Sequence, residues 1–317
     1  MGNTFYFDWE VALMEWLQSF EHPVVTAIWT FFTMFGETAA VVAFFGIFYW
    51  GFNKELGKKI GFALFSALCM CEMIKSMVLR RRPYMDNSSI KCIRPAHNDG
   101  DIYDVAHQGY SCPSAHSAMS SAFYGSIGFS FTNKIIKAIG FALPVMVALS
   151  RLYLGVHYPT DVLGGLVTGF LFISVTGLLG KKVEKEWIRY AVIAGIMLIP
   201  MLISREKEFT MIWFITVGLF GGFVFESKYV KFEDAKKPAV ALLRFAGGLI
   251  SFGLPALVLR VGMKAILGAD TVNDPHFFMF CLKGLIVGIP AFISTGIYPI
   301  LIKKLDKTSS KAEDAGG

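Results

Sequence analysis

The sequence predicts an all-α fold, a polytopic bundle of transmembrane helices. The 317-residue chain is 54% hydrophobic and only 17% charged, and its mean hydropathy is +0.53, well outside the balance of a soluble domain. Long apolar segments recur along the chain, each near the ~20 residues needed to cross ~30 Å of hydrocarbon. Short clusters of charged residues separate these segments. The bilayer is therefore an expected partner of this chain.

The apolar segments predict about nine spans. They cover approximately residues 23–52, 56–79, 113–132, 135–153, 160–180, 188–204, 209–227, 238–262 and 277–302. Phe35, Gly36 and Glu37 interrupt the first segment, where we expect a break. Residues 1–20 carry Trp and Leu interrupted by Glu10 and Glu15 at helical spacing, which predicts an amphipathic helix at the membrane interface. The polar tail at 307–317 is expected to be disordered.

The distribution of lysine and arginine predicts the orientation. Alternate loops, among them those around Lys58, Lys181 and Lys236, hold most of these residues, which favours an outside N-terminus and a cytoplasmic C-terminus. Since the basic residues lie mainly in such loops, the net charge of +6 does not indicate a nucleic-acid partner. We expect a multi-pass protein of a membrane such as the bacterial plasma membrane. Residues 80–82, three arginines on the outer side, break the rule and need a local reason.

The first candidate site segment is Lys75-x6-Arg82-Pro83. Residues seven apart differ by about 20° around a helix, so Lys75 and Arg82 would share one face if the helix continues that far, with Pro83 ending it. Arginines at helix ends commonly snorkel to the interface, but a lysine two turns deeper is more typical of a site.

The second segment is Pro113-Ser114-Ala115-His116, at the start of a span. Pro113 or Ser114 can begin a helix, whose free N–H groups and dipole attract an anion. Taken alone, Ser114 reads as a cap and His116 as an interfacial histidine.

The third segment is Ser150-Arg151-x5-His157-x3-Asp161. Pro159 suits the first turn of the following helix, which places His157 and Asp161 about one turn apart on one face. A carboxylate bonded to one ring nitrogen fixes the tautomer and leaves the other nitrogen basic. The alternative is a helix-start carboxylate near an unrelated histidine.

Together, the three segments supply the groups that phosphoryl transfer without a metal requires. The expected roles are charge neutralisation, attack on phosphorus and protonation of the leaving group. We assign them as follows: cation donors Lys75, Arg82 and Arg151, a hydroxyl and helix amides at Ser114, the nucleophile His157, its orienting carboxylate Asp161, and the acid His116.

At these residues the chain resembles the type 2 phosphatidic acid phosphatase superfamily, whose signature is K-x6-RP, PSGH and SR-x5-H-x3-D. The order and spacing match, and Ala115 in place of glycine is the departure. The resemblance implies a membrane phosphatase with no metal or other cofactor, acting through a phosphohistidine on His157. The predicted orientation places this site at the extracytoplasmic face. His116 would protonate the leaving oxygen and then activate water. Phosphatidate, phosphatidylglycerol phosphate and polyprenyl diphosphates are the expected types of lipid substrate.

The resemblance covers roughly residues 36–181, which predicts a phosphatase core at 1–181 and accessory transmembrane helices with a short cytoplasmic tail at 182–317. Two alternatives remain open. One is hydrolysis of a soluble sugar phosphate, because the architecture is similar to that of glucose-6-phosphatase. The other is a transporter or scramblase that only binds phosphate, which the charged residues Arg244 and Lys283 within late spans suggest.

The polar stretch at about 84–112 suggests further hypotheses. Cys92 and Cys112 flank it and are candidates for a disulfide. His97 and His107 lack the paired spacing of a metal site and are expected to face solvent or substrate. Arg80 and Arg81 either gather anionic substrates or anchor the chain at the interface.

Overall fold

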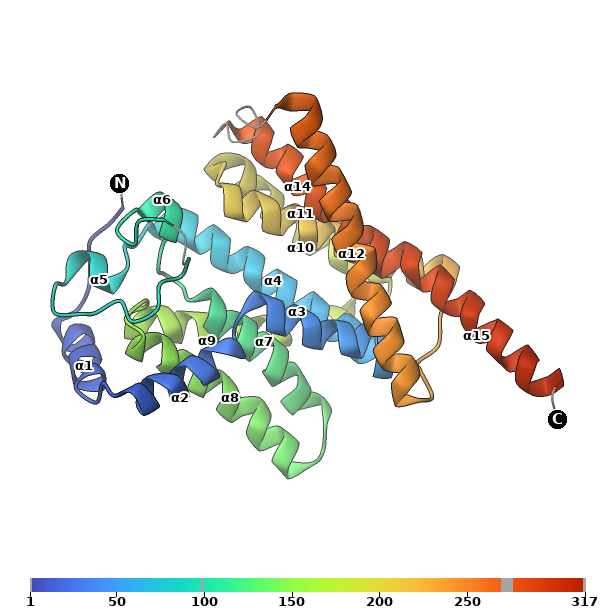
Figure 1. The fold of residues 1–317 in the computed structure, drawn as a ribbon, viewed down its shortest axis with the longest axis horizontal. Helices are drawn as coiled ribbons and strands as arrows, with labels where there is room; N and C mark the ends of the chain where they lie inside the picture. The colour runs from blue at the N-terminus through green and yellow to red at the C-terminus, as the bar shows by residue number, and fades with distance from the viewer. Residues whose placement is uncertain (1, 98–99, 269–275, 316–317) are drawn as a thin grey trace. The chain divides into compact units, whose positions relative to one another are not determined.

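The computed structural model describes residues 2–97, 100–268 and 276–315, and this part of the chain is helical, with one isolated bridge between Asn3 and Arg80 (Figure 1). The all-α prediction is confirmed. The predicted polar stretch includes 98–99 and the predicted tail includes 316–317, which lie outside the described residues.

The α-helices are α1 Asp8–Gln18, α2 Pro23–Met34, α3 Thr38–Gly46, α4 Lys54–Val78, α5 Pro83–Asp86, α6 Val105–Gln108, α7 Ala115–Ser130, α8 Lys134–Tyr153, α9 Pro159–Lys182, α10 Glu186–Ser204, α11 Lys207–Phe225, α12 Pro238–Leu267, α14 Phe277–Phe292 and α15 Tyr298–Ala315. Three π-helical segments are η1 Ile47–Phe52, η2 Glu226–Val230 and η3 Ile293–Ile297.

Several helices are long and apolar enough to cross a membrane. Among the described residues there are 7 such helices, or up to 8 when the bent pair of α2 with α3 and η1 counts as one span. This pair bends by 46° at the break expected around Gly36. The predicted count of about nine spans is not confirmed, and the difference lies at α7, the remaining predicted span, whose helix has 16 residues.

The prediction of a disordered tail is wrong as far as Ala315. Helix α15 continues from the apolar residues at its start through most of the polar tail. Lysine, alanine and glutamate are good helix formers, and extending an existing helix avoids the unfavourable nucleation step.

The described chain divides into two compact units. The first comprises Met1–Val42 and Ala63–Gly177, and the second comprises Ala43–Phe62 and Leu178–Gly317. All three predicted site segments belong to the first unit. The predicted division after residue 181, into core and accessory helices, stays a prediction.

Close helix packing in the first unit positions the site. Helices α7 and α8 run side by side, and α1 and α2 pack against α8 (Figure 1). Helix α9 approaches α7 so closely that a Cβ added at Gly165 would lie 2.4 Å from the carbonyl oxygen of Ser114. Glycine is therefore required here, because any side chain would push the start of α7 away from α9.

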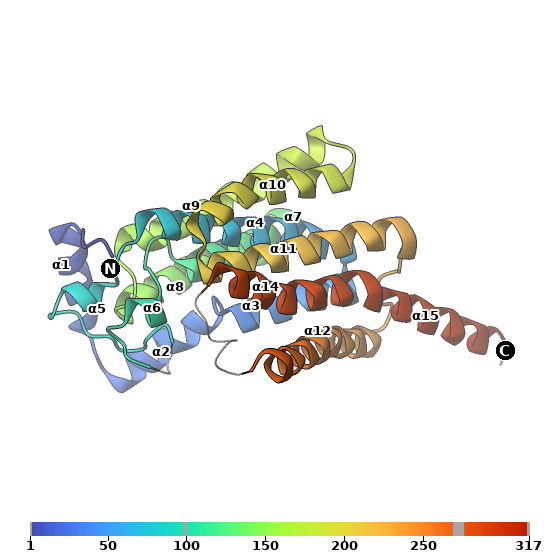
Figure 2. The same ribbon diagram turned by 90° about the horizontal axis from the view of Figure 1, so that it is seen from above.

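In the second unit, α11 and α14 lie side by side (Figure 2). Arg244 on α12 forms an ion pair with Asp306 at 2.5 Å and donates to the carbonyl of Glu233. The Arg244 side chain thus has a pairing partner within its own unit, and the same unit buries Glu226 between Lys54 and Lys58. Buried charges paired in this way are expected within membrane helices.

Candidate active site

A cavity of about 400 Å³ lies in the first unit, where the predicted site segments meet. Its volume is in the range of small-molecule sites. The titratable residues that line it are Glu37, Lys75, Arg82, Arg94, His97, His116, Arg151 and His157. Five of the seven predicted site residues therefore line one cavity, and the other two, Ser114 and Asp161, are buried and are not among the lining residues.

Lys75 and Arg82 do not share one helix, so the condition for placing them on one helical face is not met. Helix α4 ends at Val78, and Leu79 takes a left-handed backbone conformation with φ +54°. Pro83 begins the short helix α5 instead of ending α4. The backbone at 79–81 is held by Asn3, whose N–H donates to the carbonyl of Leu79 at 2.7 Å and whose carbonyl accepts from the N–H of Arg81 at 3.0 Å. An extended segment thus carries Arg82 to the cavity.

The two cations of the first segment have different partners. Lys75 pairs with Glu72, one turn earlier on α4, at 2.7 Å. Arg82 is buried and donates from Nε and Nη2 to the carbonyl of Gln108 and from Nη1 to the carbonyl of Val156. These partners are neutral carbonyls and do not offset the positive charge of the Arg82 guanidinium, so that charge can attract an anion in the cavity.

The second segment begins a helix as expected. Ser114 is the N-cap of α7, and its Oγ accepts from the N–H of Ser117 at 3.4 Å. The N–H of Ser114 donates to the carbonyl of Asp161 at 2.9 Å, which joins the second segment to the third. His116 and Ala115, in the first turn of α7, line the cavity where the helix dipole favours an anion.

In the third segment, Arg151 lies in the last turn of α8 and is buried. Its Nη1 donates to Thr33 Oγ1 at 2.8 Å, whereas in the described structure its buried Nε lacks a hydrogen-bond partner. A buried donor without a partner carries a desolvation penalty that a bound anion would remove. The Arg151 Nε–H is therefore a candidate donor to an anionic ligand.

His157 and Asp161 lie against each other as the spacing predicts. Helix α9 begins at Pro159, and Asp161 Oδ2 lies 3.7 Å from His157 Nδ1. This separation is longer than a direct hydrogen bond. Burial, followed by the positive charges of Arg82 and Arg151, lowers the pKa of His157 well below its usual range. The imidazole is therefore neutral at pH 7, the state in which one ring nitrogen can act as a nucleophile.

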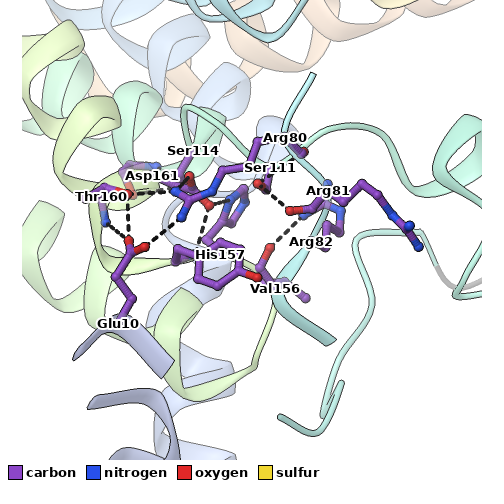
Figure 3. Close-up of polar contacts among 12 residues, drawn as sticks. Glu10, Arg80, Arg81, Arg82, Ser111, Ser114, Val156, His157, Thr160 and Asp161 are labelled. Atoms are coloured by element: carbon purple, nitrogen blue, oxygen red, sulfur yellow. Dashed lines mark hydrogen bonds and ion pairs between the residues drawn. The ribbon is translucent and has the colours of Figure 1, made fainter. Parts of the chain in front are cut away.

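Sequence reasoning missed a second layer of charge around Asp161. Arg80 is 1% exposed and bonds to both Asp161 and Glu10, so neither of the two roles suggested for it is available (Figure 3). Glu10, expected on the polar face of an interfacial helix, is fully buried. The helix α1 itself is confirmed, and the location at the membrane interface stays a prediction. Arg81, by contrast, is partly exposed and lies 3.4 Å from Asp86.

A second missed feature is Arg94, a fourth basic residue lining the cavity. It pairs with Glu37 at 2.6 Å, and both side chains are about one-third exposed. Glu37 lies at the break between α2 and α3, while Arg94 comes from the polar stretch. The abundance of polar residues in that stretch was the available signal, but no spacing linked Arg94 to Glu37.

The hypothesis of a disulfide is not supported, because Cys92 and Cys112 are both free thiols in the structure. Burial raises the pKa of each thiol, and that of Cys112 reaches about 12. His97 and His107 contact each other, with ring centroids 5.8 Å apart, and His97 lines the cavity. Among the described residues, no group of three or more His, Cys, Asp or Glu side chains could hold a metal ion.

Comparison with known proteins places a family domain over this site. Residues 56–184 match the PAP2 superfamily, and this part of the chain is a PAP2 superfamily domain. Phosphatidylglycerophosphatase B of Bacillus subtilis is 31% identical over 106 residues, which is 30% of this chain and 50% of that protein.

Two further relatives carry names of lipid phosphatases. The undecaprenyl-diphosphatase of Sulfolobus acidocaldarius is 27% identical over 140 residues, 42% of this chain and 62% of that protein. Lipid A 1-phosphatase of Rhizobium johnstonii is 31% identical over 107 residues, 30% of this chain and 43% of that protein. The chain thus spans between 43% and 62% of the length of the three relatives named here. No solved structure matches the chain.

Proposed function

We propose that this protein is an integral-membrane phosphatase that hydrolyses lipid phosphomonoesters or diphosphates at the extracytoplasmic face. One observation carries the proposal: Lys75, Arg82 and Arg151 line the same cavity as His116 and His157, and Asp161 lies behind His157. Three cations suit a phosphate dianion or a diphosphate. The names of the three relatives support a phosphorylated lipid as the class of substrate.

The proposed reaction proceeds in two steps. In the first, the His157 nitrogen that faces away from Asp161 attacks phosphorus, and the bond between phosphorus and the leaving oxygen breaks while His116 donates a proton to that oxygen. His116 enters this step protonated, because the bound phosphate dianion offsets the positive charges around it. In the second, His116 takes a proton from water, whose oxygen attacks phosphorus and breaks the bond to His157. Inorganic phosphate leaves, and both imidazoles return to their first state. Asp161 stabilises the positive charge that develops on His157.

The arrangement of the first unit supports this location of the site. The ends of α4 and α8 and the starts of α7 and α9 meet at the cavity, at the chain positions that the distribution of basic residues assigns to the outer side. A lipid substrate there would place its phosphate among the cations and its tail against apolar helix surfaces. Labelling of tags on the two chain ends in intact cells tests this orientation, and an N-terminus accessible only from the cytoplasm would contradict it.

Phosphate release by the purified protein tests the activity. The assay in detergent with EDTA compares phosphatidylglycerol phosphate, a polyprenyl diphosphate, phosphatidate and a sugar phosphate. We expect hydrolysis of at least one lipid without added metal, and its loss in the His157→Ala variant. Faster hydrolysis of the sugar phosphate would favour a soluble substrate. Wild-type protein no faster than the variant on every substrate would favour a phosphate-binding transporter or scramblase.

A further inference from the structure

All three guanidinium nitrogens of Arg80 donate hydrogen bonds to groups around Asp161. Its Nη1 donates to Asp161 Oδ1 and to Thr160 Oγ1, each at 2.7 Å, and its Nη2 donates to Glu10 Oε2 at 2.7 Å (Figure 3). Its Nε donates to the carbonyl of Phe5 at 2.9 Å. The guanidinium also lies over the ring of Tyr158, 4.0 Å from the centroid. Because the guanidinium is planar and rigid, these contacts fix the Arg80 side chain in one orientation.

Glu10 is the second charged member of this cluster, and it comes from helix α1. Its Oε2 accepts from Arg80 and from the N–H of Phe7, at 2.7 and 2.9 Å. Its Oε1 accepts from the N–H and the Oγ1 of Thr160, at 3.0 and 2.6 Å. Glu10 is 0% exposed. Four hydrogen bonds therefore hold the Glu10 carboxylate in one place.

Asp161 is thereby fixed in one rotamer. Its Oδ1 accepts from Arg80, and its Oδ2 accepts from the N–H of Tyr158 at 2.8 Å and faces His157 Nδ1. The side chains of Ser111 and Cys112 also contact this carboxylate. The direction in which Asp161 faces His157 is thus set from the opposite side, by Arg80.

The charges in this cluster do not cancel. Arg80 carries one positive charge and lies between two carboxylates, those of Glu10 and Asp161. If Arg80 were paired with Asp161 alone, it would neutralise the charge that His157 requires opposite it. With Glu10 present, one net negative charge remains on the cluster beside the imidazole.

We propose that Arg80 and Glu10 are positioning residues for Asp161, with Arg80 fixing the orientation of its carboxylate and Glu10 preserving its net charge toward His157. This inference rests on the proposed function. It makes helix α1 part of the active site, because Glu10 offsets the charge of Arg80 from there. A purely structural role for the same pair would lower stability without changing the chemistry at His157.

The Glu10→Gln variant tests the charge directly, because glutamine keeps the shape of the side chain and removes its charge. We expect kcat for the lipid phosphate to fall about 10- to 100-fold while KM stays within about twofold, since the charge acts on the reaction step and not on substrate binding. The acidic limb of the kcat/KM profile should move to lower pH, because less negative charge beside His157 disfavours its protonation. The control is Glu15→Gln, the same change at an exposed position of the same helix, which should match wild type.

A double variant separates positioning from stability. In an Asp161→Asn background, adding Glu10→Gln should not lower kcat further, because its effect is exerted through Asp161. If Glu10→Gln unfolds in detergent, Arg80→Lys is measured instead, and a kcat loss that vanishes in the Asp161→Asn background supports the same conclusion. A Glu10→Gln protein with wild-type kcat and pH profile would overturn the inference. So would an equal loss in both backgrounds. The proposed function fails separately, if wild type releases no phosphate or His157→Ala retains the activity.

Discussion

Arg82 Nη1 donates to the backbone carbonyl of Val156 at 3.0 Å. This bond connects the first site segment to the residue that precedes His157. The same guanidinium holds the carbonyl of Gln108, in the polar stretch, through two further bonds. One side chain therefore ties together three parts of the chain that are far apart in sequence, and the same residue lines the cavity.

Replacing Arg82 by lysine should lower kcat/KM by about 10²-fold or more. A lysine ammonium has three donors on one nitrogen and cannot hold two carbonyls in different directions while binding phosphate. The loss should appear in phosphate release from any lipid substrate. The neighbouring Arg81→Lys variant is the control, because Arg81 is partly exposed and pairs with Asp86. An Arg82→Lys protein with the activity of the control would contradict this account of the site.

Activity should persist well below the usual pKa of histidine. The pKa of His157 is lowered from 6.5 by burial and by the neighbouring arginines, so the imidazole stays neutral as pH falls through 6.5. The acidic limb of kcat/KM is therefore expected well below pH 6.5. The unfolded chain would bind this proton already near pH 6.5, so the contribution of His157 lowers folding stability as pH falls below that value. If the acidic limb of the kcat/KM profile belongs to His157 and lies above pH 6.5, the lowered pKa of this histidine is contradicted.

Arg94 and Glu37 should affect binding of substrate more than the reaction step. Arg94→Ala removes one of four cations from the cavity, and we expect KM to rise about tenfold with a smaller change in kcat. Glu37→Gln frees Arg94 from its ion pair and should lower KM. Lys91→Gln serves as the control, because Lys91 pairs with Glu21 and is not among the lining residues of the cavity. Equal KM values in all three variants would rule out a role for Arg94 in binding.

Two adjacent glycines on α9 should respond differently to alanine. Gly165→Ala places a Cβ 2.4 Å from the Ser114 carbonyl oxygen, and we expect a loss of about 1–3 kcal/mol in stability from this overpacking. At Gly164 the nearest atom would lie at 3.5 Å, an ordinary contact, and the higher helix propensity of alanine should leave Gly164→Ala at least as stable as wild type. Thermal unfolding in detergent compares the two. Equal midpoints would show that α7 and α9 do not approach this closely.

The features that the sequence predicted are those with local signals. The span break at Gly36, the cap at Ser114 and the start of α9 at Pro159 each follow from short-range rules of helix formation. The spacing of His157 and Asp161 likewise predicted their contact within one helical turn. Such rules act over a few residues, which is why they can be read without the fold.

The features that sequence reasoning missed depend on contacts between distant residues. Glu10 and Arg80 are 70 residues apart, and nothing near either position indicates that they pair. The end of α4 at Val78 was missed for a related reason, because the left-handed conformation of Leu79 is held by the N-terminal residue Asn3. Long-range contacts of this kind also overrode the helical periodicity that was used to place Arg82.

Trapping of the phosphoryl group on the protein tests the central claim most directly. Purified protein is mixed with a lipid substrate that carries a labelled terminal phosphate, quenched in alkali within the first turnover and digested. We predict label on the peptide that contains His157 and none in the His157→Ala variant, which should also lose at least about 10³-fold in phosphate release. Label on another residue, or release of phosphate by His157→Ala at the wild-type rate, would contradict the account.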